Sequence, residues 1–138
     1  MATRFRARMR SFAVMLATSS IVLGVPTVAQ APSLAMLDGL QKGEWEIRYR
    51  TGEPTQRICL RTGRELIQLK HRQAGCNRFV VEDAQGEVTV QYTCPGDGYG
   101  RTNIRRESAV LVQLETQGIA DGRPFSATGE GRRMRPCP

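Results

Sequence analysis

The fold class follows from residues 43–50, which read Gly-Glu-Trp-Glu-Ile-Arg-Tyr-Arg. Apolar and charged side chains alternate here, so that Trp45, Ile47 and Tyr49 fall on one side of the chain. A period of two residues is typical of a strand with one buried and one solvated face. The stretch therefore predicts a sheet that covers a core with one of its faces.

Further strands are expected after this one. A turn at 51–54 leads into a second strand, and the later segments that alternate or carry β-forming residues are 77–83, 87–94, 99–107, 110–115 and 125–132. Clusters of glycine, proline, asparagine and aspartate separate short strands in this way. The spacing predicts a mainly β domain, built as an antiparallel meander that curls into a half-open or closed barrel.

One short helix is expected after the second strand. Thr62 and Glu65 have the spacing of a capping box, and apolar side chains follow within residues 66–69. His71, the single histidine, belongs to a basic run that suits the negative end of a helix, and Gly75 can close it. This interpretation places His71 at a solvated helix end.

The first 31 residues have the organisation of a secretory signal peptide. Four arginines within residues 1–10 precede an uncharged apolar run over residues 11–25, and small residues follow. This run of 15 residues is shorter than the roughly 20 that a spanning helix needs. Cleavage is therefore expected, after Ala29 or alternatively after Ala31 or Ala35.

The predicted organisation has three parts: a signal peptide at 1–29, a linker at 30–38 and a β domain at 39–138. The apolar run of the signal peptide is expected to be helical. No permanent membrane span remains after cleavage. The expected location is the periplasm of a Gram-negative bacterium, or the medium.

The charge of the chain does not favour a nucleic-acid partner. The formal net charge is +7, but the part from Pro32 onward carries 16 basic and 13 acidic residues. Eighteen of the 20 basic residues are arginines, and they are scattered among acids. A nucleic-acid surface would need them gathered on one face.

Four cysteines follow the predicted signal peptide: Cys59, Cys76, Cys94 and Cys137. An even count in a short exported chain predicts two disulfides, and the spacings of 17, 18 and 43 lack the close ligand pairs of a zinc site. We expect Cys59 to pair with Cys76, because they bracket the helix, and Cys94 with Cys137, because this ties the chain end to the meander. Pairing Cys59 with Cys94 and Cys76 with Cys137 stays open.

Several motifs, taken in order, resemble a family of small exported proteobacterial domains of unknown function. They are Gly43-x-Trp45-Glu46, the strand that ends at Cys59 with a helix behind it, Cys76 opening a strand, Tyr92-Thr93-Cys94, and Arg135-Pro136-Cys137. The resemblance covers residues 38–137. It implies a periplasmic, disulfide-bonded β domain and no catalytic residues.

The residues themselves give no catalytic motif, metal site or phosphate loop, and no cofactor is expected. The binding candidates are Arg101, Arg105 and Arg106, which form a basic patch with the arginines of 132–135 if the chain end lies near them. Such a patch suits a lipid headgroup or an acidic glycan. Trp45 and Tyr49 either line a ligand cavity or belong to the core.

The sequence therefore favours a non-enzymatic binding or interaction module of the cell envelope, with a lipid, a glycan or a protein as partner. The alternative is a small envelope enzyme whose site carries no recognisable motif.

Overall fold

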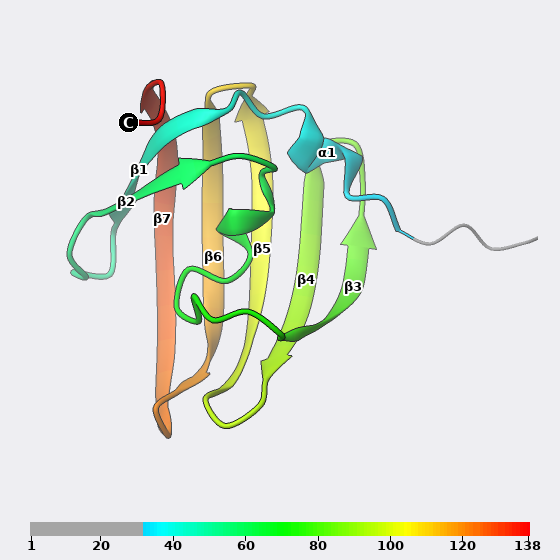
Figure 1. Ribbon diagram of the computed structural model, residues 1–138, viewed down its shortest axis with the longest axis vertical. Coiled ribbons are helices and arrows are strands. Elements are labelled where there is room, and N and C mark those ends of the chain that lie inside the picture. Colours follow the sequence, from blue (N-terminus) through cyan, green and yellow to red (C-terminus); the bar gives the residue numbers. More distant parts are fainter. Residues whose placement is uncertain (1–31) are drawn as a thin grey trace, which may run out of the picture. The chain divides into compact units, whose positions relative to one another are not determined.

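The computed structural model describes residues 32–138 (Figure 1). The predicted signal peptide and its cleavage after Ala29 lie outside the described residues. Part of the predicted linker lies inside them and belongs to the folded domain, because Leu34, Met36 and Leu37 are buried. Within this part of the chain, no helix is long and apolar enough to cross a membrane.

Within residues 32–138 one sheet of seven strands forms the domain. The strands are β1 (Gly43–Tyr49), β2 (Gln56–Leu60), β3 (Asn77–Asp83), β4 (Glu87–Cys94), β5 (Gly98–Ser108), β6 (Leu111–Ala120) and β7 (Arg123–Arg135). Their order in the sheet is β2-β1-β7-β6-β5-β4-β3, and all neighbours are antiparallel. Strands β2 and β3 are free edges, so the predicted meander is confirmed but the sheet does not close into a barrel.

The predicted alternation is confirmed where it is strongest. Trp45 and Ile47 of β1 are fully buried, and the inner face continues over Val88 and Val90 of β4. In Figure 1 the strands β1 and β2, the segment 61–76 and the helix α1 (Ala35–Asp38) lie on the same side of β4–β7. This side holds the core, and the opposite side of β3–β7, here called the outer face, meets solvent.

The short helix expected after β2 is present at that place, but its type is 3-10 and not α. A single 3-10 turn, η1 (Arg64–Leu66), follows β2, whereas the short α-helix α1 precedes β1. The segment 66–69 is buried at every position, and a surface helix would bury only one side of its turn. One hydrogen bond of the capping box is present: Glu65 accepts the backbone N–H of Thr62 at 3.1 Å.

The predicted disulfide pairing is also wrong. The bonds join Cys59 to Cys137 and Cys76 to Cys94. The segment 61–76 runs from one edge of the sheet to the other, so Cys59 and Cys76 lie at opposite edges. Cys76 directly precedes β3 and stands beside Cys94 of β4, with 4.3 Å between the Cα atoms. Two disulfides indicate an oxidising, extracytoplasmic environment.

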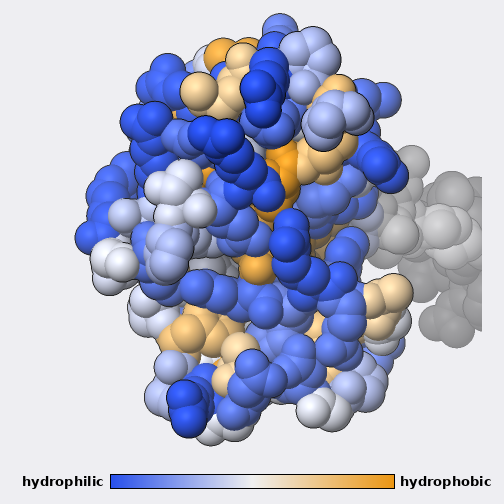
Figure 2. All heavy atoms as spheres, turned by 60° about the vertical axis from the view of Figure 1, so that its left-hand side comes forward, coloured by the Kyte–Doolittle hydropathy of each residue, from blue (hydrophilic) through white to orange (hydrophobic). Residues whose placement is uncertain are grey.

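The side of the molecule that carries β2 and β7 is mostly hydrophilic, with hydrophobic residues in small separate areas (Figure 2). The exposed large hydrophobic side chains of the described residues are Phe79, Val81, Tyr99 and Met134. Three of these four lie on β3 and β5, which directs attention to the outer face of these strands.

Candidate functional site

Trp45 belongs to the core and lines no ligand cavity. It is fully buried, and its indole N–H donates to the carbonyl of Gln41 at 2.9 Å. Tyr49 is half-buried at the end of β1, where its hydroxyl donates to Gln56 Oε1 at 2.9 Å. Burial raises the pKa of Tyr49 to about 12, and the charge of Glu53 adds to the shift. Both rings therefore have structural partners.

The predicted basic patch does not form. Strand β7 lies between β1 and β6, so the arginines of 132–135 have no place beside β5. Arg106 is on the inner side of β5 and donates to the carbonyl of Gln85 at 3.2 Å. Arg105 is on the outer face but pairs with Glu107 at 3.2 Å. Of the three predicted arginines, Arg101 alone reaches the outer face without an ion pair among residues 32–138.

The expectation that His71 lies at a solvated helix end is wrong. The ring is fully buried, with Nδ1 3.0 Å from the Tyr92 hydroxyl and Nε2 3.0 Å from the carbonyl of Ile119. A carbonyl only accepts, so Nε2 carries the hydrogen and Nδ1 accepts from the Tyr92 hydroxyl in the neutral ring. Burial raises the pKa of Tyr92 to about 12, with Asp97 adding to the shift. This pair fastens the segment 61–76 to the sheet and engages both ring nitrogens of His71.

The outer face of β4–β7 is hollowed beside Tyr99. The hollow has a volume of about 390 Å³, and its lining residues are Gln91, Tyr99, Arg101, Gln117, Gly118, Ile119, Pro124 and Phe125. We call it the outer-face hollow. Register accounts for this set, because Tyr99 stands opposite Ile119, which in turn stands opposite Pro124.

A row of polar side chains runs next to Tyr99. Arg101 of β5 stands opposite Gln91 of β4 on one side and Gln117 of β6 on the other. Among residues 32–138, no hydrogen bond or ion pair engages these three side chains. Phe79 of β3 extends the row, since it stands opposite Gln91 and is 70% exposed. The face thus offers two aromatic rings, one guanidinium and two amides to a ligand.

Several side-chain types that often carry catalysis are engaged elsewhere in the described part of the chain. Within the described residues, no group of three His, Cys, Asp or Glu side chains has the geometry to hold a metal ion. All four cysteines are in disulfides, so none is available as a nucleophile. The only histidine has both ring nitrogens occupied.

Comparison of the chain with protein-family models, with curated proteins and with solved structures finds no match. The resemblance to the exported proteobacterial domains stays a prediction.

Sequence reasoning missed most of the outer-face hollow. It predicts a strand at 99–107 and names Arg101 as a binding candidate, but it singles out neither Tyr99 nor the two glutamines. The available signal was the alternation itself, because Gly100, Thr102 and Ile104 face inward and thereby place Tyr99 and Arg101 outward. The amides of β4 and β6 became part of the site only through strand order.

Proposed function

We propose that the protein is a non-enzymatic binding module of the cell envelope that holds an acidic glycan in the outer-face hollow. The observation that carries the proposal is the pairing of Tyr99, which is 49% exposed, with a neighbouring Arg101 that has no acidic partner among residues 32–138. An exposed aromatic ring beside a guanidinium that makes no ion pair is a typical composition of a recognition surface.

Each side chain suits one part of such a ligand. The ring of Tyr99 supplies an apolar plane on which the hydrocarbon face of a sugar ring can pack. The guanidinium of Arg101 binds a carboxylate through two parallel hydrogen bonds. The amides of Gln91 and Gln117 each donate and accept, as sugar hydroxyls do.

The compartment agrees with this ligand class. Two disulfides indicate an extracytoplasmic environment, where glycans are abundant and nucleic acids are not the usual partners. The predicted export signal leads to the same compartment, with the periplasm or the medium as the location.

The test is titration of the oxidised protein with a short uronic-acid oligosaccharide, followed by backbone amide shifts in NMR. We expect saturable shifts that centre on the hollow. The affinity should be at least about tenfold weaker in Arg101→Gln, since a hydrogen bond to a charged group contributes about 1.5–3 kcal/mol. Tyr99→Ala should weaken the affinity at least about tenfold as well, because it removes the apolar plane for the sugar ring. Arg105→Gln is the matched control. It removes the same charge from the same face of β5, but Arg105 is already paired with Glu107.

Equal weakening by Arg101→Gln and Arg105→Gln would show a general charge effect and contradict a defined site. A neutral oligosaccharide of the same length that binds as tightly as the acidic one would contradict the role of Arg101.

A further inference from the structure

The sheet leaves a gap between its two edges. Strands β2 and β3 each pair with a single neighbour, and the segment 61–76 crosses from one to the other. A hollow of about 260 Å³ remains where this segment meets the edge strands; its lining residues are Ile58, Cys59, Arg64, Glu65, Gln68, Leu69, His71, Arg72, Gln73 and Arg78. We call it the seam pocket. It contains three arginines and one acid.

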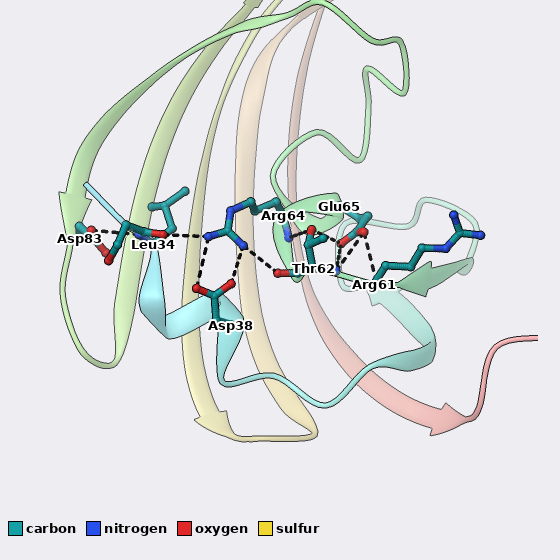
Figure 3. Close-up of polar contacts among 8 residues, drawn as sticks. Leu34, Asp38, Arg61, Thr62, Arg64, Glu65 and Asp83 are labelled. Carbon is teal, nitrogen blue, oxygen red and sulfur yellow. Dashed lines mark hydrogen bonds and ion pairs between the residues drawn. The ribbon is translucent and has the colours of Figure 1, made fainter. Parts of the chain in front are cut away.

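Two of the charged side chains in the seam pocket are already engaged. Arg64 binds Asp38 of α1, with Nη1 2.6 Å from Oδ1, and its Nη2 donates to the carbonyl of Ser33 at 2.8 Å (Figure 3). Glu65 accepts the backbone N–H groups of Arg61 and Thr62, each at 3.1 Å (Figure 3). Burial raises the pKa of Glu65, but these hydrogen bonds outweigh it, so that the net pKa lies below its usual range.

The other two arginines lack an acidic partner. Among the residues that the structure describes, no carboxylate pairs with Arg72 or Arg78. The Nε–H of Arg78 donates to Gln68 Oε1 at 2.6 Å, and the buried Gln68 is held in turn by donating to the carbonyl of His71 at 3.1 Å. This contact orients the guanidinium of Arg78 and leaves both of its Nη groups free.

The environment of Arg78 opposes its charge. Burial lowers the pKa of Arg78, and the positive charge of Arg64 lowers it further, while Glu65 compensates in part. A partly desolvated guanidinium near a second one is unfavourable unless an anion lies between or beside them. The fold nevertheless orients Arg78 on the inner side of an edge strand, opposite Tyr92.

We propose that the seam pocket is a binding site for a phosphate group, held by Arg72 and Arg78. Two guanidinium groups without acidic partners match the charge of a phosphate monoester, which is close to two at neutral pH, and their planar donor arrays fit its oxygens. The amide of Gln73, which also lines the pocket, donates to the carbonyl of Pro95 at 3.4 Å and has a second N–H to offer. The proposal is independent of the glycan site, because the seam pocket and the outer-face hollow share no lining residue.

The test is titration of the oxidised protein with inorganic phosphate at constant ionic strength, with the arginine Nε–H resonances observed by NMR. We expect saturable shifts of Arg72 and Arg78. The dissociation constant should rise at least about tenfold in Arg78→Gln and in Arg72→Gln, the usual effect of losing a hydrogen bond to a charged group. Arg72 makes no hydrogen bond within residues 32–138, so its variant is expected to fold even if Arg78→Gln does not.

Arg123→Gln is the matched control, because it removes an exposed arginine at the start of β7 that makes no side-chain hydrogen bond or ion pair within residues 32–138 and lines neither hollow. It should leave phosphate binding unchanged, whereas an equal loss in this variant would reduce the effect to net charge and overturn the proposal. Acetate at the same ionic strength should bind at least tenfold more weakly; equal binding would overturn the preference for phosphate. Absence of saturable shifts at both Arg72 and Arg78 would overturn the site itself.

Two further arms identify the source of the phosphate group. Glycerol phosphate should bind as inorganic phosphate does, because both present a terminal phosphate group with a charge close to two at neutral pH, and failure of both would overturn the proposal. If vesicles that contain phosphatidic acid retain the wild-type protein but not Arg78→Gln, the source is a lipid headgroup. If they retain neither while the soluble phosphates bind, the source is a soluble phosphate ester.

Discussion

The bond between Cys59 and Cys137 should carry a large share of the stability of this domain. It closes a loop of 78 residues, and the bond between Cys76 and Cys94, which closes 18, lies inside that loop. With the inner bond intact, the outer one closes an effective loop of about 60 residues, which corresponds to about 4.3 kcal/mol of unfolded-state entropy. The inner loop corresponds to about 3.2 kcal/mol.

These values are large beside the total of about 5–15 kcal/mol that a domain of this size has. The perturbation is the double variant Cys59→Ala/Cys137→Ala, and the assay is unfolding in urea under non-reducing conditions. We expect the free energy of unfolding to fall by about 4 kcal/mol. The dependence on urea should become steeper, because an unfolded chain without the long cross-link exposes more surface.

A loss below about 2 kcal/mol with an unchanged urea dependence would refute the reasoning, since the entropy of a long loop would then not be what the bond controls. Non-reducing digestion with mass spectrometry gives an independent check. It should release one peptide pair that joins Cys59 to Cys137 and another that joins Cys76 to Cys94, and a pair that joins Cys59 to Cys76 would refute the strand order as well.

Three further predictions concern the core and pH. Trp45→Ala should cost about 3–5 kcal/mol in urea unfolding, because the ring is fully buried; a loss below about 1 kcal/mol would contradict its place in the core. Gly100→Ala should cost about 1–3 kcal/mol, because the new Cβ would clash with the Tyr92 hydroxyl, whereas Gly86→Ala, with open space around it, should be nearly neutral. Stability should fall between pH 10 and about 12, because unfolding lets Tyr49 and Tyr92 ionise at their ordinary pKa of 10 while folding holds each pKa at about 12. The corresponding Phe variants should each flatten this loss in pH-dependent thermal melts, and an unchanged profile would contradict the burial of the two hydroxyls.

The sequence was informative wherever a periodic pattern reports on the two faces of one strand. Trp45 and Ile47 of β1, and Val88 and Val90 of β4, lie inward as their alternation predicts. Nothing beyond the strand itself is needed for such a prediction, because a side chain's face is set by the pleat.

The failures concern contacts between distant parts of the chain. The cysteine pairing depends on which strands are neighbours, and the two edges cannot be recognised from the local sequence around Cys59 or Cys76. The segment 66–71 looked like an amphipathic helix end, but it fills the space that closure of the barrel would otherwise occupy. There Thr102 donates to the carbonyl of Ile67 at 2.7 Å, and His71 reaches the carbonyl of Ile119. Such tertiary hydrogen bonds outweigh the weak helix preference of a short segment.

The open sheet and the seam pocket have one physical origin. Free strand edges invite pairing with other chains, and short, charged or bulged edge strands prevent it. Strand β2 has only five residues, and β3 carries Arg78, Glu82 and Asp83 with a bulge between Val80 and Glu82. The segment 61–76 then covers the core between the edges without pairing with either one as a strand. Closure by direct pairing of β2 with β3 would remove the space beside Arg78, so the proposed phosphate site exists because the sheet stays open.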